Sequence, residues 1–214
     1  MMQNALLLVA WAVSVAAQLE THVPSVPVGV VVQNGTESTH VHLDVFYDLL
    51  CPDSKANWPA LQQLMSHFKS DLRVRIVLFP LPFHHHAFFT AQAAYTVASK
   101  KESIYADFVS LMFERQAELK VGPAVNFTED EVRQHIASIV SSGNFGITSS
   151  EIMAGFEDDA VYERAVLDWK HSCDRTISDT PGFAINGIKV PEAGTFSMSD
   201  WVKVIESLVN KKST

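Results

Sequence analysis

Hydrophobic and polar residues alternate in two short segments near the start of the chain, 28–33 and 41–47, and this pattern predicts two β-strands. The turn-prone pair Asn34-Gly35 lies between them, so we expect these strands to pair with each other. Segment 73–80 is apolar and β-branched, which predicts a buried third strand. Residues 51–70 carry apolar positions at helical spacing. The order strand, helix, strand predicts a βαβ unit with two parallel strands.

The middle third of the chain carries three successive apolar stripes with helical period, which predicts a run of helices. A capping box at 128–131 opens the third of these, and a last apolar stripe capped by Ser199 or a neighbour predicts a C-terminal helix. Between them, Asn186-Gly187 separates two short apolar runs and predicts a β-hairpin. We therefore expect a compact α/β core with an inserted helical subdomain at about residues 84–175.

The first residues do not belong to this core. Residues 5–15 form an uncharged apolar run that is too short to span a bilayer as a helix, and small residues follow it in a cleavage pattern. We expect a signal peptide over residues 1–17 and a single domain over residues 18–214; the alternative is a buried N-terminal helix. The sequons at Asn34 and Asn126 agree with a secreted glycoprotein or a protein of the secretory pathway.

Composition and charge then limit the function classes. The chain has 214 residues, 47% of them hydrophobic and 19% charged, which is typical of one globular domain. Lys and Arg total 16 against 24 Asp and Glu, so we expect no nucleic-acid partner. Residues 18–214 contain no second long apolar stretch and no ER retrieval tetrapeptide, so we expect secretion in preference to membrane anchoring or retention in the ER, and no membrane partner. Its two cysteines, Cys51 and Cys173, are too few to build the fold through disulfides.

Cys51 begins the segment Cys51-Pro52-Asp53-Ser54 at the start of the first predicted helix. Unpaired amides and the positive end of the helix dipole stabilise a thiolate there, so Cys51 is a candidate nucleophile. Pro59 lies within the same helix and is expected to kink it. Thr180-Pro181, just before the predicted hairpin, is a candidate cis peptide.

These features, together with the helical insertion and the Asn186-Gly187 turn, resemble the thioredoxin superfamily, and more narrowly its DsbA-like branch. The resemblance covers roughly residue 41 to the C-terminus. It implies a thioredoxin-like α/β fold and thiol–disulfide exchange at Cys51 with protein or peptide thiols and disulfides. It also implies no cofactor, with glutathione as a candidate co-substrate. The residues that it places beside a bound substrate are Pro52, Asp53, Thr180 and Pro181.

The chain departs from the dithiol members of that branch at Ser54, where they carry a second cysteine. Without that thiol, Cys51 can form a mixed disulfide with a client or with glutathione but cannot close the usual intramolecular bond. Monothiol exchange, disulfide isomerisation, trapping of client thiols and loss of activity all stay open. Ser54 either donates a hydrogen bond to the Cys51 thiolate or satisfies backbone amides at the helix start.

Cys173 has two interpretations. It follows Val161, Ala165 and Trp169 at steps of four, which favours a small buried residue on the apolar face of a helix. The alternative is a disulfide with Cys51, because two lone cysteines in a secreted chain favour pairing. That bond would make Cys51 structural or redox-switched.

The run His84-His85-His86 follows the third predicted strand. Consecutive residues at a helix start point in different directions, so we do not expect a closed zinc site. Either His84 or His86 approaches Cys51 and stabilises its thiolate, or both lie in solvent. Asp48 either modulates the thiol or ends the strand. The aromatic residues of this region pack in the core or, if exposed, form a client groove: Phe79, Phe83, Phe88 and Phe89.

Three hypotheses follow for the function. The first is a secreted protein that performs monothiol exchange at Cys51. The second is a non-catalytic peptide-binding or chaperone-like module of the same fold. The third is a glutathione-using transferase or isomerase of the related kappa-like group; the expected signal peptide argues against it, because those enzymes are intracellular.

Overall fold

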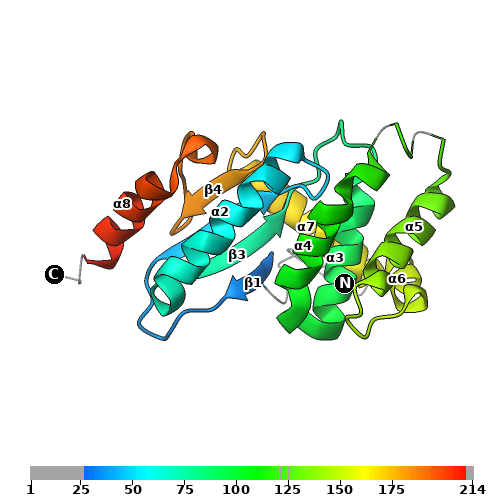
Figure 1. Cartoon of the computed structure of the whole chain (residues 1–214), viewed down its shortest axis with the longest axis horizontal. Coiled ribbons are helices and arrows are strands. Elements are labelled where there is room, and N and C mark those ends of the chain that lie inside the picture. The colour runs from blue at the N-terminus through cyan, green and yellow to red at the C-terminus, as the bar shows by residue number, and fades with distance from the viewer. Residues whose placement is uncertain (1–26, 121, 125, 211–214) are drawn as a thin grey trace, which may run out of the picture.

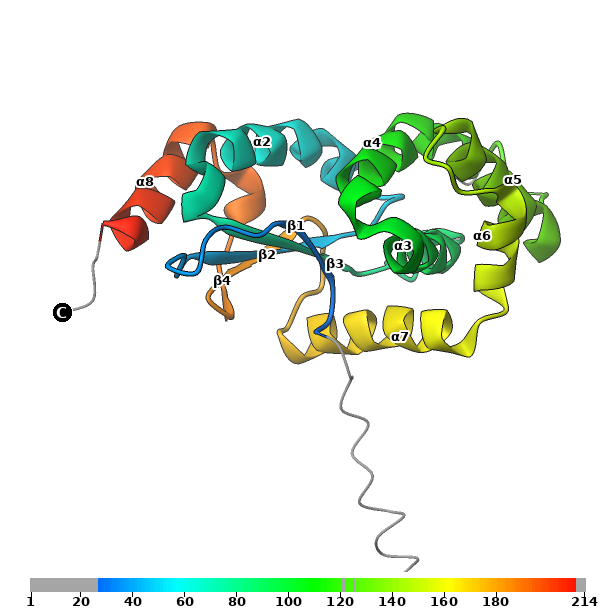
Figure 2. The same ribbon diagram turned by 90° about the horizontal axis from the view of Figure 1, so that it is seen from below.

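A computed structural model describes residues 27–120, 122–124 and 126–210. A five-stranded sheet in the order β1-β3-β2-β4-β5 forms its centre, with helices on both faces (Figures 1 and 2). The strands are β1 (Val30–Gln33), β2 (His42–Tyr47), β3 (Arg73–Leu78), β4 (Gly182–Ile185) and β5 (Ile188–Lys189). The expected signal peptide, residues 1–17, lies outside the described residues.

The predicted βαβ unit is confirmed. Strands β2 and β3 are parallel, in register from His42 opposite Arg73 to Tyr47 opposite Leu78, and helix α2 (Pro52–Phe68) connects them. Helix α2 runs as one element through Pro59 and buries one face against the sheet. The residues of that face are Ser54, Trp58, Leu61, Leu64 and Phe68. This unit places Cys51 at the carboxyl end of a central strand.

The predicted pairing of the first two strands is wrong. Strand β1 lies antiparallel to β3 at the edge of the sheet, while β2 lies between β3 and β4. The eight-residue segment between β1 and β2 is longer than a tight hairpin turn, so it does not fix the partner of β1. Asp168 adds a long-range link, because its buried carboxylate accepts hydrogen bonds from Gly29 N (2.8 Å) and Leu78 N (3.0 Å).

The predicted run of helices lies between β3 and β4. It consists of α3 (Ala87–Lys101), α4 (Tyr105–Arg115), α5 (Glu129–Ser142), α6 (Ser149–Phe156) and α7 (Asp159–Asp174). Figure 2 shows α3 to α6 grouped beyond one end of the sheet, α2 and α8 (Met198–Val209) on one face, and α7 along the other. The α/β core with a helical insertion is therefore confirmed. In the part of the chain that the structure describes, no helix is long and apolar enough to cross a membrane.

Local signals in the sequence set several boundaries. Thr128 caps α5 through the predicted capping box with Glu131, and Ser197, a neighbour of Ser199, caps α8. Strands β4 and β5 form the predicted hairpin, and its turn residues Asn186 and Gly187 both have positive φ, 50° and 80°.

Two groups of buried side chains form the core. The larger one extends from the sheet beneath α2 into the helical insertion. The smaller one surrounds the motif cysteine and consists of Phe46, Cys51, Val77, Phe79, Leu81, Ile177 and Ala184. Cys51 is thus packed among apolar side chains as well as placed at a helix start.

Candidate functional site

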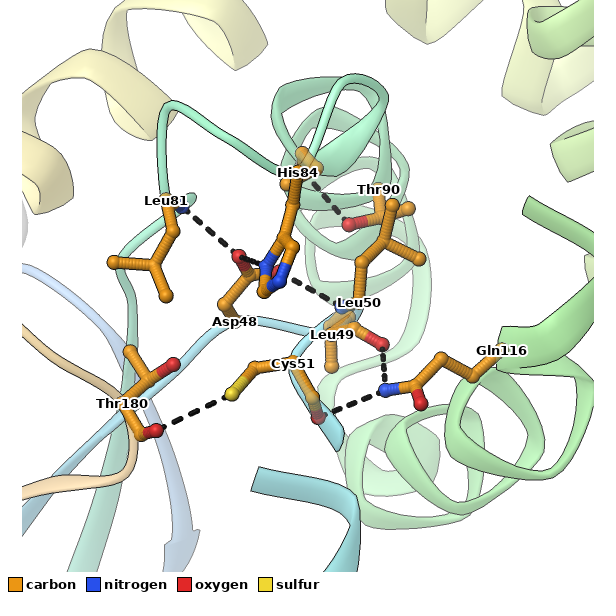
Figure 3. A network of polar contacts seen from close by, with 10 residues as sticks. Asp48, Leu49, Leu50, Cys51, Leu81, His84, Thr90, Gln116 and Thr180 are labelled. Atoms are coloured by element: carbon orange, nitrogen blue, oxygen red, sulfur yellow. Dashed lines mark hydrogen bonds and ion pairs between the residues drawn. The ribbon is translucent and has the colours of Figure 1, made fainter. Parts of the chain in front are cut away.

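Cys51 lies immediately before α2, with extended backbone angles (φ −75°, ψ 124°) at the N-cap position. Its thiol donates a hydrogen bond to the carbonyl oxygen of Thr180 at 3.2 Å, and the Thr180–Pro181 peptide bond is cis (Figure 3). Only 4% of Cys51 is exposed. The sulfur is therefore held between the start of α2 and the segment that enters β4, which are 129 residues apart in the sequence.

Ser54 makes no side-chain hydrogen bond within the described part of the chain, either to Cys51 or to a backbone amide. Its side chain is completely buried, and its Oγ has no hydrogen-bond partner among the described residues. The Thr180 Oγ1 is likewise buried and unpaired within that part of the chain. Two unpaired hydroxyls thus come from residues that flank the sulfur, one a turn along α2 and one beside the cis peptide.

The other expected substrate contacts differ in exposure. Pro52 and Asp53 are exposed and Pro181 is half-buried, whereas Thr180 is buried. The exposed residues that follow Cys51 directly in the sequence are therefore Pro52 and Asp53.

Asp48 follows β2 directly and organises the turn that leads to Cys51. Its buried carboxylate accepts hydrogen bonds from Leu50 N (2.7 Å), Leu81 N (2.9 Å) and His84 Nδ1 (2.6 Å), as Figure 3 shows. Its carbonyl oxygen accepts a further one from Cys51 N (3.1 Å). Burial raises the pKa of Asp48, and the three hydrogen bonds oppose that rise. Asp48 thereby ties the cysteine turn to the β3–α3 loop.

The structure separates the two candidate histidines. His84 reaches the cysteine turn through Asp48. His86 instead occupies the N-cap position of α3, where its ring lies edge-on to His85 at 5.9 Å. Among the described residues, no group of three or more His, Cys, Asp or Glu side chains is placed to hold a metal ion.

Gln116 belongs to the site although the sequence does not single it out. It follows α4, is buried, and donates from Nε2 to the carbonyl oxygens of Leu49 and Cys51, both at 2.9 Å (Figure 3). These contacts join residues 65 and 67 positions apart. In the sequence, Gln116 is marked only as a polar residue within an apolar helical stripe. That pattern does not indicate which residues it binds.

Both interpretations of Cys173 need correction. Cys173 is exposed, and both cysteines are free thiols, so the structure contains neither a buried Cys173 nor a Cys51–Cys173 disulfide. The buried positions of α7 are Val161, Ala165, Asp168 and Ser172. Each step of four advances about 400° around a helix, so positions at repeated steps of four drift by about 40° each time and leave the buried face. Trp169, 42% exposed, has already left it.

The aromatic residues near the site divide between packing and surface. Phe79 is 5% exposed and Phe88 and Phe89 are half-buried, whereas Phe83 is 65% exposed. Phe83 borders a hollow of about 270 Å³ whose walls include Pro52, His85 and Leu119. An exposed apolar side chain therefore lies beside the cysteine motif.

Comparison with known proteins places this geometry in a family. A family model described as thioredoxin matches residues 28–207. The thiol-disulfide exchange protein α-DsbA2 from Wolbachia pipientis is 19% identical, with a TM-score of 0.66 over 84% of this chain and 87% of that one. Oxidised BdbD from Bacillus subtilis is 16% identical, with a TM-score of 0.67 over 86% and 99%. MdbA from Corynebacterium diphtheriae, a thiol-disulfide oxidoreductase, is 16% identical, with a TM-score of 0.62 over 83% and 89%.

No curated protein matches the chain. The likeness to these structures shows the fold, which is the expected DsbA-like form of the thioredoxin fold with a helical insertion. Since the family model spans most of the chain, the chain belongs to the thioredoxin family.

Proposed function

We propose that the chain performs thiol–disulfide exchange through the single motif thiol of Cys51, on protein or peptide substrates, after entry into the secretory pathway. The observation that carries the proposal is the position of the Cys51 sulfur, at the start of α2 and against the carbonyl of Thr180 beside the cis peptide. The names of the structural neighbours α-DsbA2 and MdbA, a thiol-disulfide exchange protein and a thiol-disulfide oxidoreductase, support the same chemistry.

The proposed step is a single displacement. The Cys51 thiol loses its proton to solvent, and the thiolate attacks one sulfur of a substrate disulfide. The substrate S–S bond breaks as the new Cys51–substrate S–S bond forms, and the other substrate sulfur leaves as a thiolate and takes up a proton. A second thiol from the substrate or from glutathione then attacks the mixed disulfide and restores Cys51.

Three features of the site favour this step. The first-turn amides of α2 and its dipole favour negative charge on Cys51 Sγ. The buried hydroxyls of Ser54 and Thr180, which have no partner within the described residues, are available as donors to a thiolate. Pro52, Asp53 and Pro181 offer an accessible rim for a substrate chain.

Competition between the two cysteines tests the proposal. Exposure alone favours Cys173, since Cys51 is buried and Cys173 is exposed. We expect the reverse: oxidised glutathione added at pH 6 to 8 modifies Cys51 at least about tenfold faster than Cys173, because the fraction of reactive thiolate governs the rate. Peptide mass mapping of the adduct over time gives both rates, and Cys173→Ser and Cys51→Ala variants isolate each thiol. Equal rates, or faster modification of Cys173, contradict the proposal.

A second test restores the missing thiol. Ser54 is buried one helical turn beyond Cys51, where a cysteine side chain can approach the motif sulfur. We expect Ser54→Cys to form, on oxidation, a disulfide between Cys51 and the introduced thiol, and to accelerate the dithiothreitol-driven reduction of insulin by roughly tenfold over the parent chain. Ser54→Ala is the matched control and should gain nothing. A Ser54→Cys variant that stays reduced under oxidised glutathione argues against an exchange site.

The burial of Cys51 and the exposure of Phe83 favour a second candidate function, a non-catalytic peptide-binding module. In that case oxidised glutathione does not modify Cys51. A peptide with an apolar residue still binds, and Phe83→Ser weakens the binding of that peptide. Modification of Cys51 in the competition experiment decides against this candidate.

The proposed location rests on the apolar run and cleavage pattern at residues 1–17. Asn34 and Asn126 are exposed, which makes both accessible to a glycosyltransferase.

A further inference from the structure

The residues that the structure describes cover the sheet face that carries α7 only in part. Figure 2 shows α7 beneath one end of the sheet, toward the helical insertion, while the sheet extends beyond it. Under α7 this face is apolar, with Phe46, Val77 and Ala184 in the small core group around Cys51. Beyond that group, towards the amino ends of β2 and β3, the same face becomes charged. The alternation of β-strands and the register of His42 with Arg73 and Asp44 with Arg75 put these four side chains together.

A cleft of about 600 Å³ occupies this charged half of the face. Arginines enter it from two elements: Arg73 and Arg75 from β3, and Arg164 and Arg175 from α7 and its C-cap. Asp44 and Glu102 are the carboxylates of its wall. Among the described residues that line the cleft, four arginines face two carboxylates, which makes this lining positive in a chain whose net charge is −8.

One of these arginines is neutralised by a carboxylate. Arg75 makes a bidentate contact with Asp44, with both donor–acceptor distances at 2.8 Å. Within the described residues, Arg73, Arg164 and Arg175 have no carboxylate oxygen within 4.0 Å. Arg164 donates to Gly29 O and Arg175 contacts His171, but the Nε atoms of both guanidinium groups are buried without a partner in this part of the chain.

A second observation reports the same excess of positive charge. His171 lies next to the cleft and contacts Arg175. Its pKa is lowered to about 4, first by burial and then by the charges of Arg175 and Arg75, which outweigh the opposing effects of Asp44 and Asp174. Burial, and after it the charges of two arginines of the cleft, therefore favour a neutral imidazole at His171.

We propose that this cleft binds a small organic molecule that carries a phosphate or sulfate group. Planar guanidinium groups match tetrahedral oxyanions through paired N–H donors, and Arg73 and Arg175 supply these donors. The cleft exceeds the size of a bare anion and lies in the range of small-molecule sites. Its walls also include Val28 and Val31, which offer an apolar surface to the organic part of the ligand.

The site is separate from Cys51. The apolar group of Phe46, Val77 and Ala184 lies between the cleft and the cysteine, and β2 runs from one to the other. A ligand in the cleft therefore takes no part in thiol exchange, and its binding is tested without reference to that activity.

Calorimetric titration of the full mature chain with phenyl phosphate and with inorganic phosphate, at low ionic strength, tests the proposal. We expect saturable binding of phenyl phosphate at least about fivefold tighter than that of inorganic phosphate, and weakening of at least about tenfold in each of Arg73→Gln and Arg175→Gln, since charged hydrogen bonds of this kind carry such differences. Lys203→Gln, an exposed cation on α8, is the charge-matched control and should bind as the parent does.

Absence of saturable binding overturns the proposal, and so does equal weakening in Lys203→Gln, which indicates a general charge effect. Equal affinity for the two probes overturns the ligand class, because the apolar wall then contributes nothing. Arg73 has no assigned structural partner, so Arg73→Gln should keep the circular dichroism spectrum and the Cys51 glutathione rate of the parent. The proposal is also contradicted if Arg73→Gln changes the spectrum or the glutathione rate while Arg175→Gln still binds phenyl phosphate as the parent does.

Discussion

Asp48, three residues before Cys51, holds the cysteine turn and the β3–α3 loop together. Its carboxylate accepts three hydrogen bonds from the cysteine turn and the β3–α3 loop although the side chain is buried. A neutral amide of the same shape turns an N–H group toward at least one of these donors, so one buried donor loses its acceptor.

We therefore expect Asp48→Asn to lower the free energy of unfolding by about 1–3 kcal/mol, the usual cost of an unsatisfied buried group. We also expect it to slow glutathione adduct formation at Cys51, because Asp48 holds the turn that carries the sulfur. Urea unfolding and adduct mass measure the two effects. Asp71→Asn, an exposed carboxylate after α2, should change neither. Unchanged stability in Asp48→Asn contradicts the role assigned to these hydrogen bonds.

Helix α7 carries a buried aspartate, Asp168, and a half-buried histidine, His171, whose pKa values are shifted in opposite directions. Burial raises the pKa of Asp168 to about 7, against the lowering by its hydrogen bonds from Gly29 and Leu78. In the unfolded chain an aspartate titrates near ~3.9. Between these values the folded state binds the proton more tightly, so the contribution of Asp168 to stability is full below about pH 4 and is lost as the pH rises to about 7. The pKa of His171 is lowered to about 4. Its contribution to the stability of the fold is therefore full above about pH 6.5 and is lost as the pH falls to about 4.

The contributions of Asp168 and His171 change with pH in opposite directions. The pH dependence of stability in the parent chain alone therefore does not separate them. The difference in unfolding free energy between the parent and Asp168→Asn isolates one of them. We expect the advantage of the parent to be greater at pH 4.5 than at pH 7.5, by at most about 4 kcal/mol. Urea titrations at both pH values measure it, and a difference that grows with pH contradicts the raised pKa of Asp168.

At the scale of the whole molecule, Gln116 connects the helical insertion to the cysteine turn through two hydrogen bonds to backbone carbonyls. Gln116→Leu keeps most of the side-chain volume but leaves the carbonyls of Leu49 and Cys51 buried without this donor. We expect a loss of about 1–3 kcal/mol of stability. We also expect faster amide exchange at residues 49–51, measured by hydrogen exchange with mass spectrometry. Gln134→Leu, on the partly exposed surface of α5, is the matched control. Unchanged exchange at residues 49–51 contradicts the connecting role.

Features encoded by neighbouring residues were predictable from the sequence, and features encoded by distant ones were not. The βαβ unit, the Thr128 capping box and the Asn186-Gly187 hairpin depend on residues a few positions apart. The partner of β1 depends on which strand edges remain free once β2, β3 and β4 have assembled. The contacts of Gln116 and Asp168 span 65 to 139 positions, and no local pattern specifies them. The prediction of a buried Cys173 is wrong because positions at repeated steps of four do not stay on one face of a helix.

The hydrogen bond from Cys51 to Thr180 also has a consequence for synthesis. The ribosome makes the motif cysteine long before it makes the carbonyl that accepts the hydrogen bond of its thiol, since 129 residues separate them. A nascent chain that ends before β4 exposes an ordinary cysteine without its pocket. Assembly of the cysteine environment is thus a late event in biosynthesis, completed only when β4 has been translated and has paired with β2.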